Sequence, residues 1–438
     1  MVRFSHSMNM KFEYKNMIST LKYFFLVVLL TFSTLGRANY ILIPMDESQK
    51  NHLKSYGIAY WVLNSEIEIE WLLNYRGGSF LIPYFKSVQE ECVIRGVSFE
   101  LIVDAKASNI RLEIADPETN MEVVKLEKAP KIAVYAPKGH QPWDDAVTMV
   151  MTYAEIPYDQ IYDSSIVTGA LSKYDWLHLH HEDFTGQYGK FYAQYRNAAW
   201  YQQQQRETEA MAKFLGFSKV SELKLGVALR IKQYVAGGGY LFTMCSGTDS
   251  FDIALAAEGV DICAQVYDGD PADPSAQSKM DFNRSFAFEG FRLTMDPMVY
   301  EYSDIDGSNA HMSLSQAQDV FTLFEFSAKW DIVPTMLCQN HTTVIPGFMG
   351  QTTDFYKKFI KSSVTIMGES KQIGTARYIH GTFGKGQWTY YGGHDPEDYR
   401  HYVGDPPTDL NLHPNSPGYR LILNNVLFPA AKKKHQKT

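Results

Sequence analysis

One short segment of the chain combines a nucleophilic residue type with the small neighbours that a tight turn needs. The apolar strand Tyr240–Met244 runs into Cys245, Ser246 and Gly247 follow, and a helical pattern starts at Asp249. A nucleophile on such a strand-to-helix turn is lifted above the carboxyl edge of a sheet. Backbone N–H groups and a helix N-terminus can there lower a thiol pKa and bind an oxyanion. We predict Cys245 as nucleophile, with Ser246, Gly247 and Asp249 beside the substrate; the alternative is a buried structural cysteine at a strand end.

A thiol nucleophile needs a base, and the base needs a group that orients it. His394 ends the expected strand Gln387–His394, and Glu397 follows three residues later. Functional groups collect at the carboxyl edge of a doubly wound sheet, so a histidine and a cysteine that both end strands can meet there. We predict His394 as the base and Glu397 as its orienting group. The alternative is a surface turn held by Asp395 and Pro396.

A second group of polar residues ends the expected strand Tyr174–His181. It consists of five residues that we predict to line the substrate site: His178, His180, His181, Glu182 and Asp183. On a strand, His178 and His180 point to one face and His181 to the other. An H-x-H pair can chelate a metal, with Asp183 as a third ligand, and a structural role is also open. We favour site lining without a metal, and we predict no cofactor.

The elements that must position these residues follow a strand–helix alternation that begins at Lys131. Such alternation predicts a parallel, doubly wound α/β sheet. The expected helices include a long helical stretch stopped by Gly237–Gly239 and a closing helix before the C-terminus. The expected strands are Ile132–Ala136, Tyr158–Tyr162, Tyr174–His181, Tyr240–Met244 and Gln387–His394. The further expected helices are Trp143–Ile156 and Asp249–Gly259.

A smaller α+β module is expected before this alternation, over residues 39–128. It opens with a strand at Tyr40–Pro44, continues with a helix from near Asp46 and a turn at Gly57, and has a hairpin at Gly77–Gly78. The main domain then covers residues 129–429. Residues 262–370 are irregular and rich in Asp, Pro and Gly, and we interpret them as an insertion. Residues 430–438 form a basic tail.

The N-terminal segment has the layout of a secretory signal peptide. Lysines precede a short apolar run, Tyr23–Leu35, and small residues follow it up to Ala38. The run is too short to cross a bilayer. We predict cleavage after Ala38, leaving a periplasmic or secreted protein without stable membrane insertion. The alternative is an uncleaved anchor or a short buried helix.

Composition narrows the classes of partner. The chain has 438 residues, with 41 basic and 49 acidic ones, for a formal charge of −8. An acidic chain without a basic patch outside its last ten residues is a poor binder of nucleic acid. The four cysteines are far apart and have no zinc-ligand spacing, so no disulfide framework is expected. We expect a small-molecule, peptide or glycan substrate, and we make no prediction of the oligomeric state.

The Cys245 turn together with the late His394 and Glu397 resembles the class I glutamine amidotransferase-like superfamily. The resemblance covers roughly residues 130–429. It implies a flavodoxin-like sheet and a Cys–His–Glu triad, in which Cys245 is the nucleophile, His394 the base and Glu397 its orienter.

Nearly the whole chain is also similar to a family of exported bacterial proteins often labelled asparagine synthetase B. The similarity is carried by runs such as YILIPMD, NHLKSYGIAYWVL, YDWLHLHHEDFTGQYGKF, CQNHT and GGHDPEDY. The label implies a glutamine-hydrolysing, ATP-dependent amide synthetase. The segment Ser246–Ser250 resembles the S-G-G-x-D-S phosphate loop of such enzymes, one residue shorter. Our first hypothesis is an exported cysteine-dependent hydrolase or amidase. The alternatives are the synthetase and a non-catalytic periplasmic ligand-binding protein.

Overall fold

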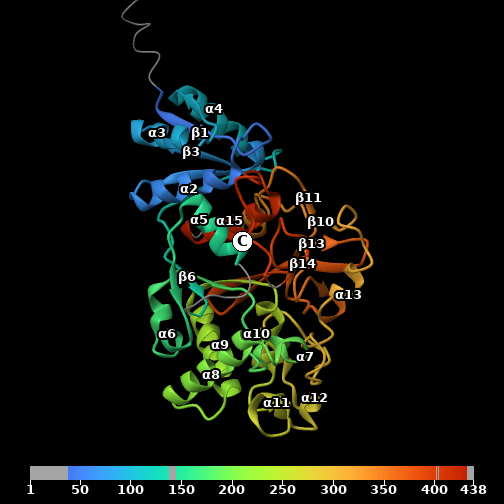
Figure 1. The fold of residues 1–438 in the computed structure, drawn as a ribbon. Coiled ribbons are helices and arrows are strands. Elements are labelled where there is room, and N and C mark those ends of the chain that lie inside the picture. Colours follow the sequence, from blue (N-terminus) through green and yellow to red (C-terminus); the bar gives the residue numbers. More distant parts are fainter. Residues whose placement is uncertain (1–37, 138–144, 401, 403, 432–438) are drawn as a thin grey trace, which may run out of the picture.

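The protein is described by a computed structural model that covers residues 38–137, 145–400, 402 and 404–431. Within these residues the chain forms two β-sheets, one of five strands and one of ten, with helices packed on both (Figure 1). This confirms the α/β class. The predicted signal segment up to residue 37 and most of the basic tail lie outside the described residues. Among those that are described, no helix is both long and apolar enough to cross a membrane.

The N-terminal sheet is antiparallel throughout, with the strand order β4-β1-β3-β2-β5. The hairpin between β2 and β3 turns through Gly77 and Gly78, as the sequence predicts, and both have positive φ. The elements of this module are β1 (Tyr40–Ile43), α2 (His52–Asn64), β2 (Ile69–Leu73), β3 (Ser79–Pro83), α3 (Lys86–Ile94), β4 (Glu100–Ile102), α4 (Asp104–Ala115) and β5 (Glu122–Leu126).

The first helix differs from the prediction at both ends. It starts at His52 rather than near Asp46, because the Asn51 side chain caps it by accepting the N–H of Lys54. Gly57 is not a turn but lies inside the helix. A Cβ on Gly57 would lie 1.9 Å from the carbonyl oxygen of Ala154, in the neighbouring helix α5 (Ala146–Ala154). The glycine therefore serves close helix packing.

One half of the large sheet is parallel, in the order β7-β6-β8-β9-β15. Its strands follow the predicted alternation, and β9 coincides with the predicted Tyr240–Met244. The strands are β6 (Ile132–Tyr135), β7 (Asp159–Ile161), β8 (Trp176–Leu179), β9 (Tyr240–Met244) and β15 (Gly386–Tyr391). Besides α5, the helices are α6 (Asp163–Val167), α7 (Tyr192–Tyr195), α8 (Ala199–Phe214), α9 (Val220–Gly237), α10 (Gly247–Ala256) and α15 (Pro417–Leu427).

The other half of the large sheet is antiparallel, which the prediction of a wholly parallel sheet missed. It continues from β15 in the order β14-β13-β10-β11, and β12 pairs with β14. Four of these strands come from residues 262–370, so part of the expected insertion extends the sheet. The strands are β10 (Val320–Leu323), β11 (Val344–Pro346), β12 (Phe355–Tyr356), β13 (Thr365–Ser370) and β14 (Thr375–Phe383), and the short helices are α11 (Gln265–Asp268), α12 (Ala276–Lys279), α13 (Ser308–His311) and α14 (Ile332–Leu337).

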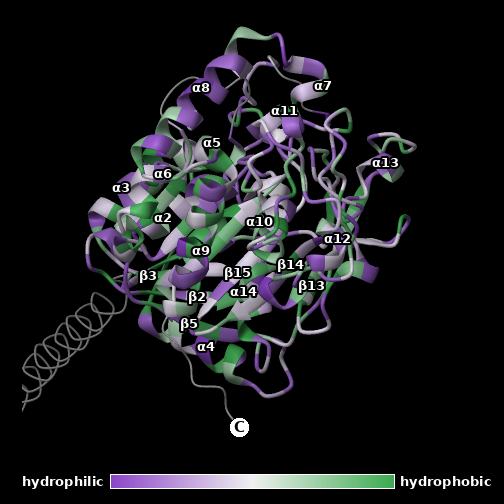
Figure 2. Cartoon of the chain, turned by 90° about the horizontal axis from the view of Figure 1, so that it is seen from below, coloured by the Kyte–Doolittle hydropathy of each residue, from purple (hydrophilic) through white to green (hydrophobic). Residues whose placement is uncertain are grey.

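One hydrophobic core connects the two sheets. Helix α15 and helix α5 both pack on α2, and buried side chains of both sheets belong to the same apolar cluster. Hydrophobic residues are concentrated on the central strands and helices, while hydrophilic residues dominate outer helices such as α8 (Figure 2). The N-terminal module is thereby fixed against the large sheet rather than carried on a linker.

The contact at Gly57 gives a test of this packing. Gly57→Ala is expected to lower the free energy of unfolding by about 1–3 kcal/mol, because its Cβ forces α2 and α5 apart. Urea unfolding followed by circular dichroism measures the change. Gly237→Ala in α9 is the matched control: nothing lies within 4 Å of its added Cβ, so it should leave stability unchanged or raise it slightly. Equal effects at the two positions would contradict the packing argument.

Candidate functional site

Three neighbouring strands end at the same edge of the parallel sheet, and each is followed by a predicted site residue. β9 lies between β8 and β15. Cys245 follows β9, His180 and His181 follow β8, and His394 follows β15 after two glycines. The carboxyl edge of a parallel sheet is where such folds collect functional groups. The structure thus brings the predicted cysteine and three of the predicted histidines to one edge.

Cys245 has a strained backbone. Its φ is +49°, which side chains other than glycine rarely adopt. Holding a non-glycine residue there costs on the order of 1–3 kcal/mol. The turn is fixed by the N–H of Gly247, which donates to the carbonyl oxygen of His180 at 2.7 Å. A Cβ on Gly247 would lie 2.2 Å from that oxygen, so only glycine fits.

The sulfur of Cys245 is enclosed and faces backbone N–H groups. The residue is 2% exposed. Burial raises the pKa of the thiol to about 11, and hydrogen bonds from the N–H groups of Thr352, Ser246 and Gln351 oppose this rise. At neutral pH the sulfur is therefore a thiol, and a nucleophilic role would require a base that takes its proton. The same N–H groups are donors of the kind that bind an oxyanion.

Two of those N–H groups belong to a loop that covers the cysteine. A Cβ on Gly350 would lie 3.0 Å from the Cys245 sulfur and 2.9 Å from the backbone nitrogen of His394, so all three meet in one small space. The Thr352 hydroxyl donates to Asp249 Oδ1 at 2.9 Å. Asp249 thereby anchors the loop instead of standing open to a ligand.

Further hydrogen bonds tie this loop to its surroundings. The N–H of Thr353 donates to Asp306 at 2.8 Å. The side chain of Gln351 donates to the carbonyl oxygens of Gly189 and Tyr300, at 2.8 and 2.9 Å. The N–H of His394 donates to Met349 at 3.0 Å, which joins the loop to the end of β15. The donors above the sulfur are thus held by several elements at once.

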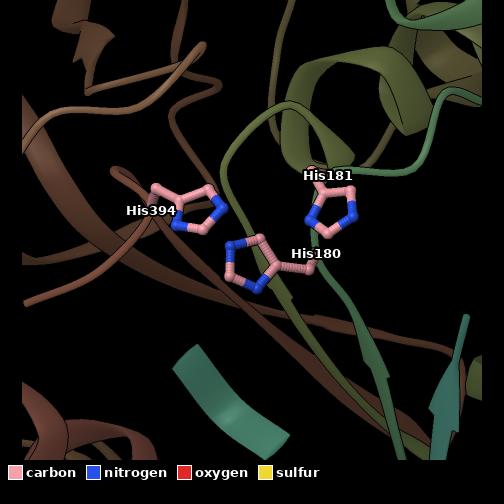
Figure 3. Close-up of side chains that lie close together, drawn as sticks. All are labelled: His180, His181 and His394. Carbon is pink, nitrogen blue, oxygen red and sulfur yellow. The ribbon is translucent and has the colours of Figure 1, made fainter. Parts of the chain in front are cut away.

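The imidazoles of His180, His181 and His394 face one another beside this turn (Figure 3). The ring centroids of His180 and His394 are 4.4 Å apart, those of His180 and His181 5.1 Å, and those of His181 and His394 5.9 Å. His180 and His394 are buried. Burial lowers the pKa of His180, which a nearby carboxylate partly offsets. Neutral imidazoles of this kind can accept a proton or ligate a metal.

That carboxylate is Asp145, which sequence reasoning missed. It caps α5 by accepting the N–H groups of Val147 and Thr148, at 2.8 and 3.0 Å. Its oxygens also lie 3.3 Å from His178 Nε2 and 3.3 Å from His180 Nδ1. An aspartate just before an apolar helical pattern is a known capping signal, but its reach to the histidines depends on the tertiary fold.

The remaining predicted residues take other partners. Glu397 lies 3.0 Å from His413, so its orienting role toward His394 stays a prediction. Asp183 accepts from Thr185 at 2.7 Å and from the N–H of Gly189 at 3.2 Å, which makes it a loop anchor.

His178 and Glu182 are held by the scaffold around the site. His178 Nδ1 contacts the carbonyl oxygen of Phe242 at 3.2 Å. Glu182 accepts from Tyr162 at 3.4 Å, and burial raises its pKa to about 7. Ser246 is buried within the turn. All four cysteines are free thiols.

Known proteins give little guidance here. No family model and no curated protein matches the chain. Among solved structures, two cytoplasmic proteins from Salmonella typhimurium align with 69% of this chain and 100% of their own, at 10% and 13% identity and TM-scores of 0.33 and 0.34. A beta-galactosidase from Bacillus circulans sp. alkalophilus aligns with 69% of this chain and 32% of its own, at 14% identity and a TM-score of 0.25. TM-scores this low carry no argument about the fold or activity of this chain.

The strain at Cys245 is testable by stability alone. Cys245→Gly is expected to be more stable than Cys245→Ala by about 1 kcal/mol, because glycine adopts a positive φ without steric cost. Thermal or urea unfolding of both variants measures the difference. Cys338, whose φ is −93°, provides the control pair, and there alanine should be the more stable substituent. The same order at both positions would argue against strain at Cys245.

The loop anchor Asp306 predicts a pH dependence. Burial and the neighbouring Asp354 raise its pKa to about 7, while hydrogen bonds from Ser308 and Thr353 act in the opposite direction. The folded protein then binds more protons than the unfolded chain between about pH 4 and 7, so stability falls as the pH rises through this window. Asp306→Asn should reduce this fall, by about 1–3 kcal/mol. Unfolding at a series of pH values tests this.

The control for this pH series is Glu207→Gln, on the exposed face of α8, which should leave the pH profile as it is. A profile unchanged by Asp306→Asn would show that the carboxyl of Asp306 titrates normally.

Proposed function

We propose that the protein is an exported, cysteine-dependent hydrolase of amides or related carbonyl compounds, with Cys245 as nucleophile. The observation that carries this proposal is the turn at Cys245. A non-glycine residue with positive φ stands between a strand and a helix, and its buried sulfur lies beside the loop at Gly350. Strain of this kind is retained where the surrounding structure and a functional role require it.

The sheet supports the resemblance to the class I glutamine amidotransferase-like superfamily. Numbered in chain order, the strands of the parallel half lie in the order 2-1-3-4-5. This is the order of flavodoxin-like sheets, which place their ligands at the carboxyl edge. Cys245 follows the fourth of these strands and His394 the fifth. The proposed fold is therefore flavodoxin-like with an antiparallel extension.

The proposed reaction begins with attack of the Cys245 sulfur on the substrate carbonyl carbon. The sulfur–carbon bond forms as the thiol proton passes to an imidazole nitrogen, which we assign to His394. The carbonyl oxygen becomes an oxyanion next to the sulfur, where the N–H groups of Gln351 and Thr352 are held. The imidazole returns its proton to the leaving amine as the carbon–nitrogen bond breaks.

Water completes the cycle. It attacks the thioester and gives one proton to the imidazole, which passes this proton to the departing sulfur, so that the carboxylic acid and the free thiol are released. In this scheme His180 and His181 line the substrate site. The assignment is supported by the backbone of His394, whose nitrogen borders the same space at Gly350 as the Cys245 sulfur. Export rests on the N-terminal segment 1–38.

The turn fits a nucleophile better than a phosphate loop. The N–H of Gly247 donates to His180, and the N–H of Thr248 donates to Cys245. Ser250 donates to Asp249 Oδ1, which also accepts from Thr352. The N–H groups of Gly247, Thr248 and Ser250 are thus used within the protein, whereas Ser246 Oγ has no hydrogen-bond partner among the described residues. This counts against the ATP-dependent synthetase as the reaction of this site.

The test of the proposal is reaction at Cys245. Protein comprising residues 39–438 is screened for hydrolysis of amides and thioesters. The same protein is treated with an electrophilic thiol probe, and the labelled residue is found by peptide mass mapping. We expect Cys245 to be labelled, and we expect Cys245→Ala and Cys245→Ser to lower kcat by at least about 10³-fold. Cys338→Ala is the control and should keep full activity.

Two outcomes would contradict the proposal. One is turnover that survives in Cys245→Ala. The other is an unlabelled Cys245 together with no turnover and a measurable affinity for a small ligand, which would favour a binding protein. Release of pyrophosphate from ATP in the presence of aspartate would instead favour the synthetase.

A further inference from the structure

The three imidazoles at the sheet edge form a group of possible metal ligands next to the turn. One nitrogen from each of His180, His181 and His394 can be chosen so that all three lie within 4.8 Å of one another. In Figure 3 the rings face a common space from two segments, the end of β8 and the chain after β15. Because these strands flank β9, the arrangement is set by the sheet and not by one flexible loop.

A second observation concerns His180. Its Nδ1 lies 3.3 Å from a carboxylate oxygen of Asp145, an ion-pair distance without hydrogen-bond geometry, and its Nε2 is buried and has no hydrogen-bond partner among the described residues. A carboxylate that holds one nitrogen of a histidine fixes the ring and leaves the other nitrogen as a ligand, the arrangement found around metal-bound histidines. Asp145 is itself fixed as the cap of α5.

From these observations we propose that His180, His181 and His394 bind one divalent transition-metal ion, with Zn²⁺ as the best match. Neutral imidazole suits Zn²⁺, Co²⁺, Ni²⁺ and Cu²⁺, and three histidines leave one position of a tetrahedral ion open. Such an ion would draw the nitrogens closer together than the 4.8 Å within which they lie. From the sequence we favoured a site without a metal, and the candidate ligands were His178, His180 and Asp183. The carboxylate of Asp183 instead accepts hydrogen bonds from Thr185.

The site has a consequence that rests on the proposed function. His394 cannot accept the proton of Cys245 while its ring nitrogen is bound to a metal. Zn²⁺ should therefore inhibit hydrolysis reversibly, and a chelator should restore it. Metal binding itself does not depend on hydrolysis, so the two proposals can fail separately.

The experiment uses the full chain without residues 1–38, stripped with a chelator, in the Cys245→Ala background. This background removes the thiol as a ligand and leaves the three imidazoles. Zn²⁺ binding is measured by calorimetry, and Co²⁺ binding by the visible absorption of the tetrahedral ion. We expect one ion per chain. His180→Gln and His181→Gln should each weaken binding by at least about 100-fold, because each removes a ligand.

Asp145→Asn tests the positioning role of the carboxylate. Asparagine still caps α5, so the fold is retained, but the hold on His180 Nδ1 is weakened and affinity should drop about 10- to 100-fold. His413→Gln is the matched control, because His413 pairs with Glu397 and contributes no atom to the group. Circular dichroism checks that each variant is folded.

The proposal is overturned if the stripped protein binds no Zn²⁺ or Co²⁺ in the micromolar range. It is also overturned if binding is the same in His180→Gln, His181→Gln and His413→Gln, which would indicate an adventitious ion. Should Cys245→Ala bind metal while wild-type protein shows no thiol-dependent turnover, the metal site stands and the proposed hydrolase fails. Thiol-dependent turnover without metal binding gives the reverse result.

Discussion

The hydrogen bond from the N–H of Gly247 to the carbonyl oxygen of His180, 2.7 Å long, is the contact on which the site depends. It joins the end of β8 to the turn between β9 and α10, and it leaves no room for a side chain on Gly247. With α10 starting at this glycine, the chain can leave β9 only through a sharp bend at Cys245, whose φ becomes positive. The same bond fixes the backbone of His180, and so sets where the imidazole stands relative to the thiol.

Burial decides the electrostatics of this edge. It raises the pKa of Cys245 to about 11 and lowers that of His180, so both groups are neutral at rest. A thiolate–imidazolium pair would have to be desolvated, which is costly in an enclosed site. The site is instead organised by neutral donors and acceptors, with the N–H groups of Gln351 and Thr352 over the sulfur. These dipoles are fixed in advance, which is the condition for stabilising charge that develops during a reaction.

Local patterns in the sequence were enough to predict the parallel half of the sheet and the turn at Cys245. β9 is a continuous apolar run that ends in small residues, and His180 and Cys245 come together because parallel strands share a carboxyl edge. The run RYIHGTF was predicted as a strand and lies in β14, but the other four strands of the antiparallel half escaped prediction because they lie in a segment rich in turn residues. The role of Gly57 escaped because it depends on Ala154, nearly a hundred positions away. Asp145 and the loop of Gln351 were missed for the same reason: their partners are fixed only by the fold.

The proposed sharing of imidazoles between a nucleophile and a metal follows from this topology. β8 and β15 flank β9, so any histidine that ends either strand is brought close both to the thiol and to the other histidines. The sequence contains these histidines but does not show which ring nitrogen faces which neighbour. The orientation of the ring decides whether a histidine can accept a proton from the thiol or bind a metal. Asp145 makes part of the choice by holding His180 Nδ1. His180 then presents Nε2 to the common space. The proposed proton transfer and the proposed metal site both require His394, which lies next to the loop over the sulfur. Competition between proton transfer and metal binding is thus centred on His394.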